Sequence, residues 1–129
     1  MKAKNPVVWF EIYVDNLERA RKFYEKVLNL KLSELRVPED SKEEMQMITF
    51  PMEMGADGAA GALVKMKGFE TGNNSTIVYF RSEDCATEES RVKAAGGKVV
   101  QSKQSIGEYG FMVLAADTEG NMFGIHSEA

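Results

Sequence analysis

Residues 7–30 read VVWFEIYVDNLERARKFYEKVLNL and predict a strand followed at once by a helix. Apolar side chains alternate over residues 7–14, which is the period of a strand whose two faces meet different surroundings. Over residues 17–28 the apolar positions recur three and four apart, which is the period of an amphipathic helix. We expect Asp15 to cap this helix and Asn29, which tolerates the left-handed conformation, to end it.

The second half of the chain repeats this order of elements. The strands expected after the first helix cover residues 30–35, 45–50 and 62–66. The second half then predicts a strand, a helix that starts near Asp84, and three more strands, over residues 76–80, 84–95, 98–101, 111–115 and 122–127. A four-stranded sheet under a single helix leaves its other face in need of a partner.

The sequence therefore predicts an α+β fold of two βαβββ modules with pseudo-twofold symmetry, which form a cleft between curved mixed sheets. One domain would span residues 1–129, with a first module at about 5–68, a linker at about 69–75 and a second module at about 76–129. A dimer that exchanges halves would complete the same arrangement and stays open as an alternative.

Composition narrows the classes of partner. The 16 basic and 20 acidic residues give a net charge of −4, without the basic surface that a nucleic-acid partner requires. No apolar run approaches the ~20 residues of a membrane-spanning helix. The single cysteine, Cys85, excludes an intrachain disulfide, and residues 1–6 contain no secretory apolar segment. We expect a cytoplasmic protein that binds neither nucleic acid nor membrane.

Several segments carry the features of a known family: residues 10–20 and 23–30 in the first half, and residues 94–99 and 117–121 in the second. They resemble the vicinal oxygen chelate superfamily, which includes glyoxalase I, bleomycin-resistance proteins, fosfomycin-resistance enzymes and extradiol dioxygenases. The resemblance covers essentially the whole chain and is greatest to short glyoxalase-related proteins. It is informative about the fold and much less so about the reaction.

The resemblance also implies where a metal would bind in this family. The metal-ligand positions carry over to Trp9, to the neighbourhood of Thr76 and to Gly124, and none of these side chains suits a divalent metal. The chain has one histidine, His126, so two imidazoles cannot meet on a metal within one copy. We therefore expect no metal and no cofactor, and neither glyoxalase-type isomerisation nor extradiol ring cleavage by the metal-dependent route.

The first strand supplies the main candidate site. Trp9, Glu11 and Tyr13 share one face, where Trp9 could stack on a flat or cationic group and Glu11 could accept a hydrogen bond or remove a proton. The alternative is a strand face that is merely solvated or covered in a dimer. The corresponding face of the second half is expected to carry Thr76, Val78 and Phe80.

Other candidates surround this face. Met47 and Gly124 complete the expected ligand-binding set, and His126 shares the alternation of Gly124 on the last strand. A pair of His126 and Glu11 could perform acid–base chemistry near neutral pH, whereas a structural role would suit a residue so near the chain end. Cys85 follows two acidic residues, which oppose its ionisation, so a nucleophile is not expected there.

Two functions follow from these residues. The first is a binding protein that holds a small, partly apolar ligand in a metal-free cleft, as in the bleomycin-resistance branch. The alternative is a metal-independent enzyme of isomerase or lyase type that uses Glu11 or His126 as general base. A scaffold role ranks below both, and a homodimer is expected under every interpretation.

Overall fold

A computed structural model describes residues 5–36, 44–72, 75–118 and 120–129. The contacts within the chain divide it into two units. One unit is Trp9–Thr76, and the other joins Ile77–Ala129 to the residues up to Val8. Parts of the expected loop at 38–43, of the linker at 73–74 and of the turn at 119 lie outside the described residues.

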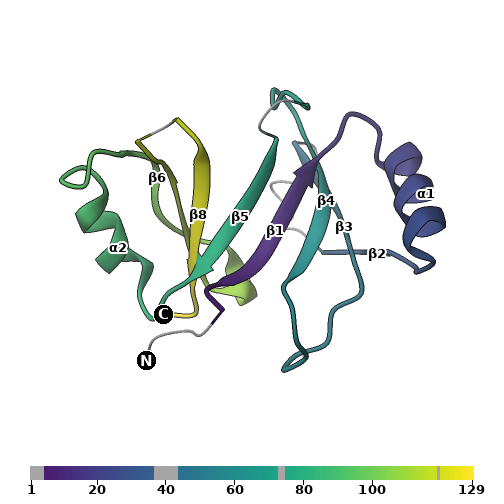
Figure 1. Ribbon diagram of the computed structural model, residues 1–129, viewed down its shortest axis with the longest axis horizontal. Helices are drawn as coiled ribbons and strands as arrows, with labels where there is room; N and C mark the ends of the chain where they lie inside the picture. Colours follow the sequence, from purple (N-terminus) through teal and green to yellow (C-terminus); the bar gives the residue numbers. More distant parts are fainter. Residues whose placement is uncertain (1–4, 37–43, 73–74, 119) are drawn as a thin grey trace. The chain divides into compact units, whose positions relative to one another are not determined.

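The first repeat forms a four-stranded sheet with one helix. Its elements are β1 (Val7–Tyr13), α1 (Leu17–Leu28), β2 (Ser33–Glu34), β3 (Met45–Thr49) and β4 (Ala60–Met66), as Figure 1 shows. The strand order is β2-β3-β4-β1, in which β1 runs parallel to β4 and the other neighbours are antiparallel.

The second repeat has the same connectivity. Its elements are β5 (Thr76–Arg81), α2 (Cys85–Val92), β6 (Lys98–Ser105), the short 3-10 helix η2 (Gly107–Tyr109), β7 (Phe111–Ala116) and β8 (Met122–Ser127). The strand order is β5-β8-β7-β6, with β5 parallel to β8 and the other neighbours antiparallel. The predicted α+β class and the repeated βαβββ order are both confirmed.

The strand expected over residues 30–35 is much shorter in the structure, and at its start side chains occupy the backbone groups of Leu32. The Leu32 N–H donates to Glu25 Oε2 at 2.8 Å, and the Leu32 carbonyl accepts from Arg21 at 3.2 Å. The Leu32 N–H is therefore not available to a ladder, and β2 begins at Ser33 and has two residues. The Leu32 amide, aided by the Arg21 guanidinium, lowers the pKa of Glu25.

The start of α1 differs from the expectation by one residue. Asn16, rather than Asp15, caps the helix, and its side-chain oxygen accepts from the Arg19 N–H at 2.9 Å. Asp15 instead accepts a hydrogen bond from the Thr71 hydroxyl at 3.0 Å. The predicted end is confirmed, since Asn29 has the left-handed φ of 53°.

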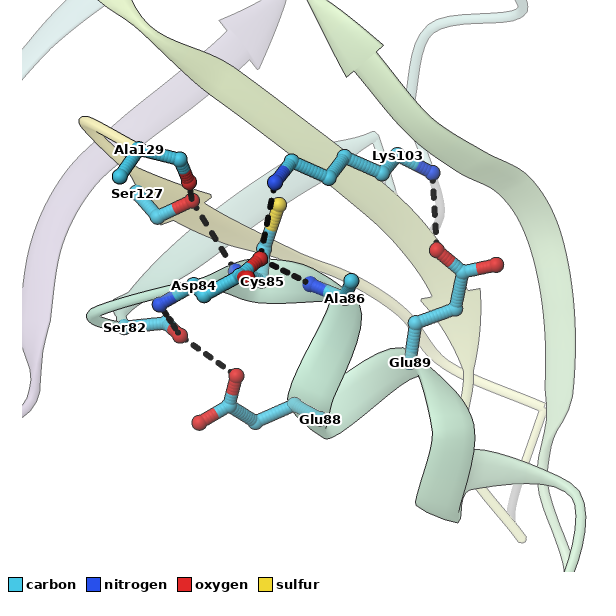
Figure 2. Close-up of polar contacts among 9 residues, drawn as sticks. All are labelled: Ser82, Asp84, Cys85, Ala86, Glu88, Glu89, Lys103, Ser127 and Ala129. Carbon is cyan, nitrogen blue, oxygen red and sulfur yellow. Dashed lines mark hydrogen bonds and ion pairs between the residues drawn. The ribbon is translucent and has the colours of Figure 1, made fainter.

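The start of α2 is as predicted. Asp84 accepts from the Ala86 N–H at 3.0 Å and from Lys103 Nζ at 2.8 Å, as Figure 2 shows. The hydrogen bond from Lys103, followed by that from Ala86, lowers the pKa of Asp84. Cys85 is fully buried in the core under α2, and its N–H donates to Ser127 Oγ at 3.0 Å. This thiol is therefore a core group, in keeping with its predicted lack of a nucleophilic role.

Each helix covers one face of its own sheet. The core under α1 is built on Leu32, Ile48, Phe50 and Leu63, and Phe10 and Ile12 of β1 pack against it. In the second repeat, Val113 and Ile125 form the corresponding core together with Cys85. Within the described residues, no helix is both long and apolar enough to span a membrane.

Candidate functional site

The candidate site lies on the face of the first sheet that points away from α1, which we call the helix-free face. Successive side chains of a strand point to opposite faces, and Phe10 and Ile12 pack under α1. Trp9, Glu11 and Tyr13 therefore point to the helix-free face. The period-two pattern of residues 7–14 predicts this shared face.

Glu11 is the centre of a small hydrogen-bonded group. The indole N–H of Trp9 donates to Glu11 Oε2 at 3.1 Å, and the Tyr13 hydroxyl donates to Glu11 Oε1 at 2.8 Å. The Glu11 residue is only 5% exposed and Tyr13 only 7%. Neither residue is therefore solvated, whereas a strand face covered in a dimer stays a prediction, and both carboxylate oxygens accept hydrogen bonds.

The neighbouring strand β4 places small side chains beside Trp9 and Glu11. In the parallel ladder Glu11 pairs with Ala62, which is fully buried, and Trp9 pairs with Ala60. On β3, Met47 pairs with Val64 of β4, the same residue that Tyr13 faces. Met47 therefore lies on the helix-free face, and Ala62 lies beside Glu11 on β4.

A shallow groove of about 520 Å³ lies elsewhere in the first repeat, at the start of α1. Tyr13, Asp15, Arg19, Phe23, Tyr24 and Thr71 are among its lining residues. Tyr13 is the single member of the predicted ligand-binding set among them.

The face predicted for the second repeat is wrong in its alternation. Phe80 pairs with Ile125, and its ring lies 5.9 Å from that of Phe123, so it points to the α2 side of the sheet. Val78 and Thr76 share the alternation of Phe80. The opposite face instead carries Ile77 and Tyr79, both buried. The strand period identifies two faces but does not say which one meets the helix.

Gly124 and His126 do share one face of β8, as expected, because their partners Leu114 and Met112 alternate in the same way. Gly124 lies under the ring of Tyr79, and a β-carbon there would overlap that ring. His126 Nε2 lies 2.6 Å from the Tyr109 carbonyl oxygen, which can only accept, so Nε2 carries the proton of this hydrogen bond. This contact favours the structural role for His126, and its pairing with Glu11 stays a prediction.

The residues at the family's metal positions do not fit a metal. The indole nitrogen of Trp9 acts as a donor, Gly124 has no side chain, and Thr76 offers a single neutral hydroxyl. Across the described ranges, no three His, Cys, Asp or Glu side chains gather as a metal site would require. These side chains therefore do not offer the set of donors that metal-dependent chemistry would need.

One contributor to the site was not identified from the sequence. The ring of Phe69 stacks on that of Tyr13, with centroids 4.1 Å apart and planes 18° apart. Phe69 falls in the segment predicted as a linker, where an isolated aromatic residue gives no periodic signal. Its place next to glycine in a polar segment is the one local hint that it has a packing role.

Comparison with known proteins identifies the fold independently. Methylmalonyl-CoA epimerase from Mycobacterium tuberculosis is 13% identical, with a TM-score of 0.68 over 100% of this chain and 93% of that one. A variant of the Streptomyces coelicolor methylmalonyl-CoA epimerase, in complex with 2-nitronate-propionyl-CoA, is 11% identical, with a TM-score of 0.67 over 97% of this chain and 98% of that one.

A hypothetical protein from Bacillus halodurans C-125 is also similar, with 11% identity and a TM-score of 0.71 over 98% of this chain and 96% of that one. At such identities the likeness concerns the fold alone. No curated protein matches the chain. The family model of the Glyoxalase/Bleomycin resistance protein/Dioxygenase superfamily matches residues 7–125, and the chain belongs to this family.

Proposed function

We propose that this protein binds a small, partly apolar ligand on the helix-free face, without a metal. Trp9, which is partly exposed, would cover a flat apolar part of the ligand, and Glu11 would accept a hydrogen bond from a cationic or N–H group. The predicted contacts of Thr76, Val78, Phe80 and Gly124 with a ligand have less support, because the side-chain directions of the second repeat differ from the expected ones.

The observation that carries the proposal is the buried carboxylate of Glu11. Removing a carboxylate from water costs free energy, and the fold could fill this position with an uncharged residue of similar size. A carboxylate that is buried at such a cost is therefore a candidate for a functional site. The neighbouring Ala62, which pairs with Glu11 in the ladder, places only a methyl group opposite it on β4.

Fluorescence titration tests the binding function, because Trp9 is the single tryptophan of the chain. The probes are benzamidine, a flat ring with one cationic amidinium, and bleomycin, for which part of the family is named. We expect a saturable change of the Trp9 emission with at least one probe, and a higher melting temperature at saturation. Benzoate is the anionic control and should produce neither effect. Absence of both effects with both probes would contradict the proposal.

A second candidate is a metal-independent enzyme in which Glu11 is the general base. The support is that Trp9 and Tyr13 hold both oxygens of one carboxylate, as a positioned base requires. Glu11 would take the proton on the carbon next to a thioester carbonyl, the C–H electron pair would move into the carbonyl to give an enolate, and a proton returned to that carbon would restore the thioester. The similar folds of two methylmalonyl-CoA epimerases make this thioester class the first to examine.

Proton exchange in D2O tests the enzymatic function. We expect the protein to incorporate deuterium at carbon 2 of methylmalonyl-CoA faster than buffer does, with the same rate in the presence of EDTA, as followed by NMR or mass spectrometry. Exchange no faster than in buffer would remove this candidate while leaving the binding function intact. Exchange that requires an added divalent metal would contradict the metal-independent route.

The proposal also includes the homodimer and the cytoplasmic location that the sequence predicts. The single free cysteine supports a reducing compartment, since nothing in the chain requires an oxidised pair. The arrangement of the two modules in one domain, or by exchange between two chains, belongs to the same set of predictions.

A further inference from the structure

The segment after β4 turns back sharply at Gly68. The Phe69 N–H donates to the Met66 carbonyl at 3.1 Å, and Gly68 has a φ of 82°. A positive φ at the third residue of a tight turn suits glycine, which has no β-carbon to strain. The Lys67 N–H donates to the Glu44 carbonyl at 2.9 Å and holds the turn from the other side. The backbone before Phe69 is therefore well fixed.

The turn places the ring of Phe69 against the ring of Tyr13. The two rings are stacked at 4.1 Å, and the hydroxyl of that same Tyr13 donates to Glu11 at 2.8 Å. A stacked ring restricts the motion of the tyrosine ring and so limits where the hydroxyl points. A chain of contacts thus runs from Gly68 through Phe69 and Tyr13 to the Glu11 carboxylate.

Two further contacts fasten the same region to the end of β1. The Thr71 hydroxyl donates to Asp15 at 3.0 Å, and the Tyr13 N–H donates to the Ser75 carbonyl at 3.0 Å. The backbone of Tyr13 is therefore fixed independently of its ring. Loss of the Phe69 ring would remove this restraint on the Tyr13 ring and leave its strand in place.

We infer that Phe69 is a positioning residue of the Glu11 site, which acts through the Tyr13 hydroxyl. The inference rests on the proposed function of Glu11 for its consequence in ligand binding. Its mechanical part stands on contacts within the first repeat and does not require a ligand.

A double-mutant cycle tests this chain of contacts. The variants are Phe69→Leu, Tyr13→Phe and the two combined. Trp9 emission is the first readout, because the Trp9 indole donates to the same carboxylate. We expect Phe69→Leu to shift the emission in the same direction as Tyr13→Phe, and to add no further shift once the Tyr13 hydroxyl is absent. Phe69→Tyr, which keeps an aromatic ring at this position, should have the same Trp9 emission as the wild-type protein.

Binding of benzamidine is the second readout, and we expect Phe69→Leu to weaken it by about two- to tenfold. Phe123→Leu is the matched control, because it removes one ring of an aromatic pair in the other repeat and should leave Trp9 emission unchanged. If Phe69→Leu does not fold, Gly68→Ala keeps the ring and strains the turn that presents it.

The outcomes of these experiments distinguish the positioning role of Phe69 from the proposed binding function. Additive shifts in the cycle, or an emission shift with Tyr13→Phe and none with Phe69→Leu or Gly68→Ala, would overturn the positioning role. A wild-type protein that binds no probe, together with a coupled emission cycle, would overturn the proposed binding function and retain the positioning role.

Discussion

Glu11→Gln is expected to weaken benzamidine binding by about 10- to 100-fold and to leave the fold intact. Glutamine has the shape of glutamate, so its oxygen can still accept from Trp9 or Tyr13. It lacks the negative charge, however, and a hydrogen bond to a charged group contributes about 1.5–3 kcal/mol. Isothermal titration or Trp9 fluorescence measures the affinity, and circular dichroism checks the fold.

A matched control separates the local effect from net charge. Glu18→Gln removes the same charge from α1, where Glu18 is largely exposed and lies 3.7 Å from Arg21. We expect wild-type affinity from Glu18→Gln, since exposed charges at a distance are screened. Equal affinities of the two variants would show that Glu11 does not contact the bound probe.

Gly110→Ala is expected to be the most destabilising single-methyl change in the second repeat. Gly110 lies between η2 and β7 with a φ of 104°, which is unfavourable for any other residue. A β-carbon would also overlap the backbone carbonyl oxygen of Ser127, which cannot move without disturbing β8. Strain and overlap together predict a loss of about 3 kcal/mol in the free energy of unfolding.

Thermal unfolding measures this loss, which corresponds to a melting temperature lower by about 10 °C in a chain of this size. Gly107→Ala is the matched control in the same loop. Gly107 has a φ of 71°, but no atom lies within 4 Å of the point that its added methyl group would occupy. Only the backbone strain of about 1 kcal/mol therefore applies to Gly107→Ala. Similar melting temperatures for the two variants would mean that the Ser127 carbonyl moves away from the added methyl group without loss of stability.

Some features of the candidate site could be predicted from the sequence, whereas others depend on contacts that only the folded chain makes. The shared direction of Trp9, Glu11 and Tyr13 follows from the strand period alone, so the sequence contains it. The burial of Glu11 and its two hydrogen bonds depend on the neighbouring strands and on side-chain directions. Phe69 reaches Tyr13 because of the turn at Gly68, and no periodic pattern in the sequence predicts that turn.

Local sequence was sufficient for the order of elements, the two repeats, and the helix boundary residues Asn29 and Asp84. These features depend on spacing and on the conformational preferences of single residues, which act between near neighbours. Three other features required the packed chain: Phe80 faces α2, Leu32 leaves its strand, and Asp15 contacts Thr71 while Asn16 caps α1. Each of these features depends on contacts between residues that are not neighbours in the sequence, and such contacts exist only once the chain is folded.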